Sequence, residues 1–200
     1  MSAGATAARA LTQLVLVRHG ETQWSREGRH TGPHSDIPLS DQGRMQARAL
    51  GSRLAGISAA AVLHSPARRA RETCALAGFE AGAEEHQALA EWDYGSFEGL
   101  TMAAIQERAP GWSLWRDGAP GGETPQAISA RADALLAELR SRSGALLLFA
   151  HGHILRVLAV RWIDLPVACG ARLAMAPAAI SILGFERQTE VISAWNRTDS

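Results

Sequence analysis

The chain of 200 residues contains no lysine, since all 20 of its basic residues are arginine. This absence excludes a Walker-A lysine and a Schiff-base lysine, and with them the enzyme classes that depend on either group. The two cysteines, Cys74 and Cys169, have neither the number of a disulfide scaffold nor the spacing of a metal or redox motif. We therefore expect a protein of a reducing compartment, the cytoplasm.

Long apolar runs and net charge are lacking as well. No stretch approaches the roughly 18 apolar residues of a membrane span, and the first dozen residues have no signal-peptide core. The 20 acidic residues balance the 20 basic ones, so the chain has no overall field that would attract nucleic acid or a membrane surface. We expect neither of these partners, a flexible tail over residues 1–12, and a single domain over residues 13–200.

Short apolar runs bounded by polar residues predict strands that are buried on both faces of a parallel sheet. Two such runs are clear, at 14–17 and 146–149, and a weaker one lies at 61–63. Apolar spacing and capping residues predict helices, and the C-terminal part predicts strands that form an antiparallel end of the sheet. The expected helices are 41–55, 66–76, 125–142 and 153–163, and the expected later strands are 172–176, 179–185 and 190–195.

Strands that alternate with helices predict a layered α/β fold. Helix 125–142 is the best defined, because five apolar residues recur on one of its faces. These are Ile128, Ala132, Leu135, Leu136 and Leu139. Helix 66–76 is expected to have Ser65 as its N-cap and Pro66 in its first turn. Region 108–124 is rich in glycine, proline and tryptophan without periodicity, which predicts a long ordered loop.

Both clear strands end in a histidine followed by a glycine, His19-Gly20 after the first and His151-Gly152 after the later one. In open α/β sheets, ligands bind outside the carboxyl ends of the strands. Neighbouring strands of this kind would therefore present two imidazoles to one pocket. The glycines would let a ligand approach the backbone closely.

Arginines at the same sheet edge predict an anion site. Arg68 and Arg69 fall in the first turn of a helix, where unpaired amides and the helix dipole favour an anion, and Arg18 adds a planar guanidinium from the first strand. Together they suit a phosphate dianion, although the spacing alone does not decide between Arg68 and Arg69. Glu91 supplies a proton donor for a departing alkoxide.

The remaining histidines are assigned structural roles. His153 is expected to open a helix and His64 to cap a strand. His30 and His34 have a spacing that could suit a metal, but Pro33 interrupts any helix between them and no cluster of acidic or cysteine ligands accompanies them. We therefore expect neither a metal nor a cofactor.

These motifs, in this order and spacing, resemble the histidine phosphatase superfamily, in its phosphoglycerate-mutase-like branch and closest to its small phosphatases. The resemblance covers about residues 14 to 195 and implies a three-layer α/β/α sandwich with a mostly parallel central sheet. The matching segments are Leu16 to Thr22, Gly28 to Gly32, Ile37 to Ser40, Ser65 to Ala70, Glu91 to Gly99, and Ala150 to Gly152.

The resemblance also implies two in-line phosphoryl transfers. His19 attacks phosphorus, Glu91 protonates the leaving oxygen, and water then releases phosphate. Register with the family assigns Arg69 to the phosphate pocket and leaves Arg68 on the rim. The pocket residues implied with His19 and Glu91 are Arg18, Arg69 and His151, and the substrate-binding residues expected are Ser25, Thr31, Gly32, Trp92, Tyr94 and Gly152.

Two substitutions favour a phosphatase over a mutase. Trp92 and Met102 stand where the mutases have an arginine and a lysine that grip a carboxylate. We expect hydrolysis of small phosphomonoesters to inorganic phosphate, with a homo-oligomer compatible with the sequence. The alternatives are a bisphosphoglycerate-dependent phosphoglycerate mutase and a phosphate-binding module without turnover. Specificity is expected to depend on Trp24, Trp92, Phe97, Met102 and the loop 108–124.

Overall fold

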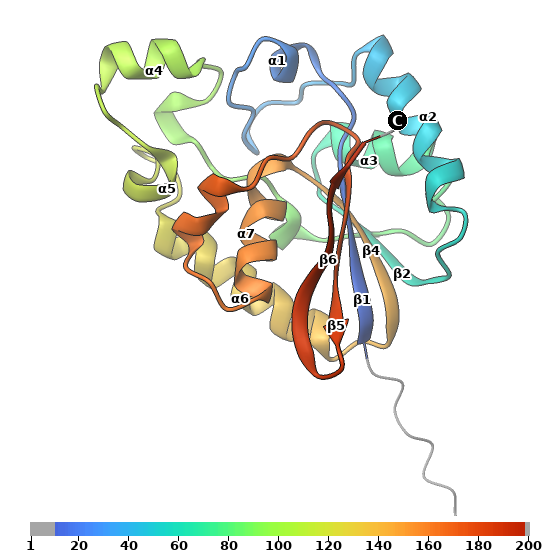
Figure 1. Cartoon of the computed structure of the whole chain (residues 1–200). Coiled ribbons are helices and arrows are strands. Elements are labelled where there is room, and N and C mark those ends of the chain that lie inside the picture. Colours follow the sequence, from blue (N-terminus) through green and yellow to red (C-terminus); the bar gives the residue numbers. More distant parts are fainter. Residues whose placement is uncertain (1–10, 199–200) are drawn as a thin grey trace, which may run out of the picture.

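In the computed structural model, which describes residues 11–198, six strands form one sheet in the order β3-β2-β4-β1-β5-β6 (Figure 1). The pairs β3/β2, β2/β4 and β4/β1 are parallel, whereas β5 is antiparallel to both β1 and β6. The expected antiparallel end of the sheet is thus present. The strands are β1 (Leu11–Arg18), β2 (Ala59–His64), β3 (Glu84–Glu85), β4 (Gly144–Ala150), β5 (Ile180–Glu186) and β6 (Thr189–Arg197).

Helices cover both faces of this sheet, because successive side chains of a strand point to opposite faces. Leu14 and Leu16 of β1 join the core cluster under α6 (Pro125–Arg140) and α7 (Gly152–Trp162). Val15 and Val17 join the cluster under α2 (Asp41–Leu54) and α3 (Arg68–Leu76). The three-layer α/β/α sandwich is therefore confirmed, with α6 and α7 on one side of the sheet and α2 and α3 on the other (Figure 1).

The long helices begin where the sequence places their caps. The Ser40 side chain accepts a hydrogen bond from the backbone N–H of Gly43 at the start of α2, and Thr124 caps α6 in the same way. All five residues of the predicted apolar stripe on α6 are buried. Burial of this stripe against α7 and the sheet fixes the helix in place.

Short helices lie among the segments that surround the sheet edge. The loop expected at 108–124 contains one short helix, and a second helix just before it was not expected from the sequence. The short elements are α1 (Gln23–Arg26), α4 (Met102–Arg108) and α5 (Leu114–Asp117), with the 3-10 helices η1 (Gln87–Leu89), η2 (Gly95–Phe97) and η3 (Val167–Arg172).

Two expected elements differ from the structure. The strand expected at 172–176 is wrong, because its backbone groups bond to side chains instead of to a neighbouring strand: the Met175 carbonyl accepts from Arg18 and the Ala176 N–H donates to Asn196. Helix α3 begins at Arg68, two residues later than expected.

Residues 1–10 of the expected tail lie outside the described residues, whereas residues 11 and 12 belong to β1. Among residues 11–198, no helix has the length and apolar character needed to cross a membrane.

Candidate active site

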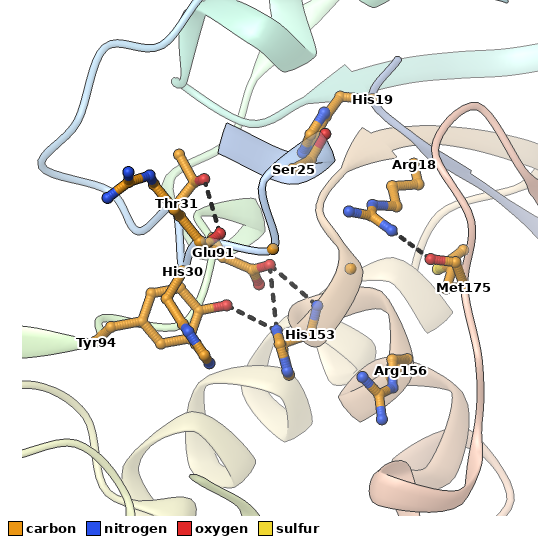
Figure 2. A pocket seen from close by; sticks show the side chains of 13 residues that line it. Arg18, His19, Ser25, His30, Thr31, Glu91, Tyr94, His153, Arg156 and Met175 are labelled. Carbon is orange, nitrogen blue, oxygen red and sulfur yellow. Dashed lines mark hydrogen bonds and ion pairs between the residues drawn. The ribbon is translucent and has the colours of Figure 1, made fainter. Parts of the chain in front are cut away.

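The two histidines lie side by side because their strands are parallel neighbours. Arg18 of β1 is in register with Ala150 of β4, so the residues that follow, His19 and His151, leave the sheet at the same edge. Their ring centroids are 5.2 Å apart in an edge-to-face arrangement. A cavity of about 200 Å³ opens beside His19 (Figure 2). Its lining comprises Arg18, His19, Ser25, Gly28, Arg29, His30, Thr31, Glu91, Tyr94, Gly152, His153, Arg156 and Met175.

The His19 imidazole is held as a neutral base. Its Nδ1 lies 2.7 Å from the carbonyl oxygen of Gly20, and because a carbonyl only accepts, Nδ1 carries the proton. Burial lowers the pKa of His19 well below its usual value, and the charges of Arg69 and Arg18 lower it further. The neutral ring therefore keeps a lone pair on Nε2, the atom that a nucleophile needs.

His151 is fixed by hydrogen bonds to both ring nitrogens. Arg69 Nε donates to its Nδ1 over 3.2 Å, so the proton is on Nε2, which donates to the Ser65 hydroxyl over 2.7 Å. Burial and the charge of Arg69 lower the pKa of His151 well below its usual value. The remaining nitrogens of the buried Arg69 side chain donate to the backbone carbonyls of Thr31, Gly32 and Ser35.

Arg18 has a donor that no group of the protein satisfies. Its Nη1 donates to the Met175 carbonyl, but its Nε is buried and has no partner among the described residues. The guanidinium lies against Gly152, where an added Cβ would be 3.5 Å from Arg18 Cζ and Nε. A buried N–H without an acceptor costs free energy unless a ligand supplies one. The geometry suits an anion beside Arg18 and the backbone of Gly152, which both line the cavity.

Glu91 is held by the backbone at the start of α7. Its Oε1 accepts hydrogen bonds from the N–H groups of Trp92 and Ile154, and its Oε2 accepts one from the N–H of His153. Burial raises the pKa of Glu91, but its interactions with His153, above all hydrogen bonding, outweigh burial and set the pKa well below its usual value. The carboxylate is therefore ionised in the free protein.

The structure brings most of the expected site residues together. Arg18, His19 and Glu91 line the cavity, as do Ser25, Thr31, Tyr94 and Gly152 from the substrate-binding set. Arg69 and His151 lie buried behind His19 instead of on the cavity wall.

Two expected binding residues do not line the cavity. The Trp92 side chain is fully buried and its indole N–H donates to the Glu123 carbonyl, so the expectation that Trp92 lines the pocket is wrong. Gly32 is buried outside this cavity, and its carbonyl accepts a hydrogen bond from Arg69.

Four polar residues of the cavity wall were not expected there: Arg29, His30, His153 and Arg156. His153, assigned to opening a helix, lies in the first turn of α7, which begins one residue earlier at Gly152. It also lines the cavity, as does Arg156 one turn further along α7. Their i, i+3 spacing after His151 was the available signal. His30 was considered as a metal ligand from its sequence spacing, and no metal was expected there. It lies on the cavity wall, and its Nδ1 donates to the Leu100 carbonyl.

Within residues 11–198, one group of side chains has the spacing of metal ligands: His34, Asp93 and Glu98. Both carboxylate oxygens of Asp93 already accept hydrogen bonds, from the Gly95 N–H and from His34. None of the three residues lines the cavity. The negative charge of Glu98 acts on the buried guanidinium of Arg69.

Comparisons with known proteins agree with this geometry. A family model described as "Histidine phosphatase superfamily (branch 1)" matches residues 14–198. An acid phosphatase of Mycobacterium tuberculosis is 45% identical over 178 residues, 87% of each chain. A "Probable phosphoglycerate mutase" of Salmonella choleraesuis is 33% identical over 196 residues, 92% of this chain and 90% of that protein. A structure of a mycobacterial glucosyl-3-phosphoglycerate phosphatase with inorganic phosphate has a TM-score of 0.80 at 31% identity, covering 94% of this chain and 98% of that one.

Proposed function

The chain belongs to branch 1 of the histidine phosphatase superfamily, and from this premise we propose that it hydrolyses small phosphomonoesters without a metal, through a phosphohistidine on His19. The observation that carries the proposal is the neutral His19 ring with its free Nε2, beside the unpartnered Nε of Arg18. A nucleophile and a guanidinium that can donate a hydrogen bond to an anion thus lie at one small cavity.

In the first step, His19 Nε2 attacks phosphorus while Arg18 and the backbone of Gly152 hold the nonbridging oxygens. Arg69 holds His151 in place and adds a buried positive charge behind the phosphoryl group. Glu91, which takes up a proton when the bound dianion disfavours a second negative charge beside it, gives that proton to the leaving oxygen. In the second step, Glu91 takes a proton from the water that attacks the phosphohistidine, and inorganic phosphate leaves.

The Arg156 guanidinium on the cavity wall favours a small substrate that carries a second acidic group. Arg156 Nε donates to the Gly170 carbonyl and its guanidinium lies over the Trp115 ring, 4.5 Å from the ring centroid. This arrangement fixes the group at the cavity wall, across from the glutamate (Figure 2). A guanidinium in this position suits a carboxylate or a second phosphate on the alcohol part of the ester.

We also propose a cytoplasmic location, supported by two cysteines that form no disulfide, Cys74 and Cys169. Substrate and inorganic phosphate are the partners that this chemistry requires.

The test is detection of the phosphoenzyme. Wild-type protein incubated with a labelled phosphomonoester and quenched in alkali should carry an acid-labile phosphoryl group, and turnover should continue in excess chelator. The variant His19→Ala should lose both the label and the activity, whereas His34→Gln, with a side chain that is 70% exposed and outside the cavity, should keep both. Full activity in His19→Ala would refute the proposal, and so would loss of wild-type activity in chelator.

The family also includes mutases, which share this pocket chemistry. Phosphorus NMR separates the two activities: with 3-phosphoglycerate and a catalytic amount of the bisphosphate, a phosphatase releases inorganic phosphate and a mutase makes the 2-isomer. The fully buried Trp92, which stands where the mutases carry an arginine, supports release of phosphate.

A further inference from the structure

Side chains with rings form one side of the cavity wall: His30, Tyr94 and His153 (Figure 2). The His30 ring lies edge to face with Tyr94, with ring centroids 4.8 Å apart, and nearly parallel to the His153 ring at 6.3 Å. Trp112 contacts the same ring edge to face at 6.1 Å. These three neighbours hold the plane of the His30 ring, so its two nitrogens have defined positions.

One of the two nitrogens of His30 is used by the backbone. Nδ1 lies 3.1 Å from the carbonyl oxygen of Leu100, and because a carbonyl only accepts, Nδ1 carries the proton. The backbone N–H of His30 donates to the same carbonyl, and its own carbonyl accepts from the N–H of Gly99. Burial lowers the pKa of His30, so the ring is neutral at neutral pH. Its Nε2 therefore has a lone pair and no proton.

This second nitrogen is open to the cavity. Within residues 11–198, Nε2 of His30 makes no hydrogen bond, and the buried side-chain atoms that lack a partner belong to Arg18 and Glu98. Nε2 is therefore accessible to solvent. Because His30 lines the cavity, the accessible atom is a hydrogen-bond acceptor on its wall.

The phosphoryl group of a substrate cannot satisfy this acceptor. The nonbridging oxygens of a phosphate dianion carry no proton, and neither does the ester oxygen, so none of them can donate to Nε2 of His30. A carboxylate on the substrate cannot donate either, which separates this position from Arg156. The donor has to be a group on the alcohol part of the ester, and a hydroxyl is the group that an alcohol of this kind supplies.

Building on the function proposed above, we propose that His30 is a specificity-determining residue whose Nε2 accepts a hydrogen bond from a hydroxyl group on the alcohol part of the ester. The substrate class is then the phosphomonoesters of polyols and hydroxy acids, as distinct from simple alkyl phosphates. An ester without the hydroxyl displaces water from Nε2 and leaves the acceptor unpaired, so the site selects against it. No proton is transferred at His30.

Two esters with one carbon skeleton test this selection. Glycerol 2-phosphate and isopropyl phosphate differ in the two hydroxyl groups that the first carries and the second lacks. Neither has a second acidic group, so Arg156 has no anion to bind in either. The measurement is kcat/KM for each ester. The ratio of the two values is then compared between wild type and variants, so that the intrinsic difference between the leaving groups cancels.

Two variants separate the acceptor of His30 from its anchor. In His30→Asn, the shorter amide lies near the position of Nδ1, where it can still donate to the Leu100 carbonyl, and no atom replaces Nε2. In His30→Gln, the longer amide reaches the position of Nε2 with an oxygen that accepts, and the anchor is lost. His34→Gln is the control, because the His34 side chain is 70% exposed and outside the cavity.

We expect wild type to prefer glycerol 2-phosphate. His30→Asn should lower the ratio of kcat/KM for glycerol 2-phosphate to that for isopropyl phosphate by roughly tenfold, the contribution of one neutral hydrogen bond. Its kcat/KM for isopropyl phosphate should change little, which also shows that the variant folds. His30→Gln should keep most of the preference, and His34→Gln should keep all of it.

An unchanged ratio in His30→Asn would overturn the assignment, and so would a wild type without the preference. A ratio in His30→Gln no higher than that in His30→Asn would do the same, because it would assign His30 to anchoring its segment at Leu100. Each of these results leaves the proposed function standing as long as wild type forms the phosphoenzyme and His19→Ala does not. Hydrolysis of neither ester by wild type would instead contradict the proposed function itself.

Discussion

Replacing Glu91 by glutamine tests how strongly the start of α7 holds this side chain. Glutamine keeps the shape, and its oxygen still accepts from the N–H groups of Trp92 and Ile154. The nitrogen that replaces Oε2 faces the His153 N–H, which then loses its acceptor. Loss of a charge-assisted hydrogen bond and of the acceptor for a buried donor should lower the free energy of unfolding by about 2–4 kcal/mol at neutral pH.

This loss depends on pH in a defined direction. The pKa of Glu91 in the folded protein lies well below its usual value, and in the unfolded chain it is about 4.3. The carboxylate therefore contributes its full stability above the unfolded pKa, and the contribution fades as pH falls through the folded pKa. The free energies of unfolding of wild type and Glu91→Gln should converge in acid.

Urea unfolding at neutral and acidic pH measures both effects. The control Glu107→Gln changes an exposed carboxylate of α4 and should stay within about 0.5 kcal/mol of wild type. In parallel, Glu91→Gln should slow phosphorylation by an aliphatic ester by roughly 100- to 10,000-fold. If Glu91→Gln unfolds at neutral pH with the wild-type free energy, the three backbone hydrogen bonds do not hold this carboxylate and the reasoning fails.

Three further predictions follow from the packing and charges of the site. First, because burial and the charges of Arg69 and Arg18 lower the pKa of His19 well below its usual value, its NMR signals should show a neutral Nδ1–H ring throughout pH 5 to 8. A titration of His19 near pH 6.5 would contradict this. Second, Arg156→Gln should raise KM roughly tenfold or more for esters whose alcohol carries a second acidic group, and leave KM for phenyl phosphate nearly unchanged. An equal rise for both would assign Arg156 to packing on Trp115. Third, Gly43→Ala should destabilise the fold by about 1–3 kcal/mol, since a Cβ there would lie 2.0 Å from the Glu21 carbonyl oxygen, whereas Gly56→Ala meets no atom within 4 Å and should be nearly neutral in the same urea assay.

Much of the fold was predictable because the relevant signals are local. Continuous apolar runs identified β1 and β4, and a serine or threonine before a periodic stretch identified the starts of α2 and α6. The segment 172–176 was predicted wrongly for the opposite reason. Its carbonyls accept hydrogen bonds from the side chains of Arg18 and Trp195, which are far away along the chain. No pattern within the segment indicates such partners.

The residues of the predicted site also divide into those with a local sequence signal and those placed by distant parts of the chain. The His-Gly pairs after two parallel strands were enough to place His19 and His151 together, because parallel register carries both strand ends to one edge. The wall of the cavity was harder to predict. Trp92 follows Glu91 directly in sequence, yet its side chain points into the core, where it contacts Trp115 edge to face.

The sequence by itself determined which groups exist: an all-arginine set of cations, two histidines at strand ends, and one glutamate suited to proton transfer. Tertiary structure decided their chemical states. The proton of His19 is on Nδ1 because the Gly20 carbonyl lies 2.7 Å away, and Glu91 is ionised because the first turn of α7 donates to it. Tautomer and ionisation depend on partners and burial at distances of a few ångströms, and only the folded chain sets those distances.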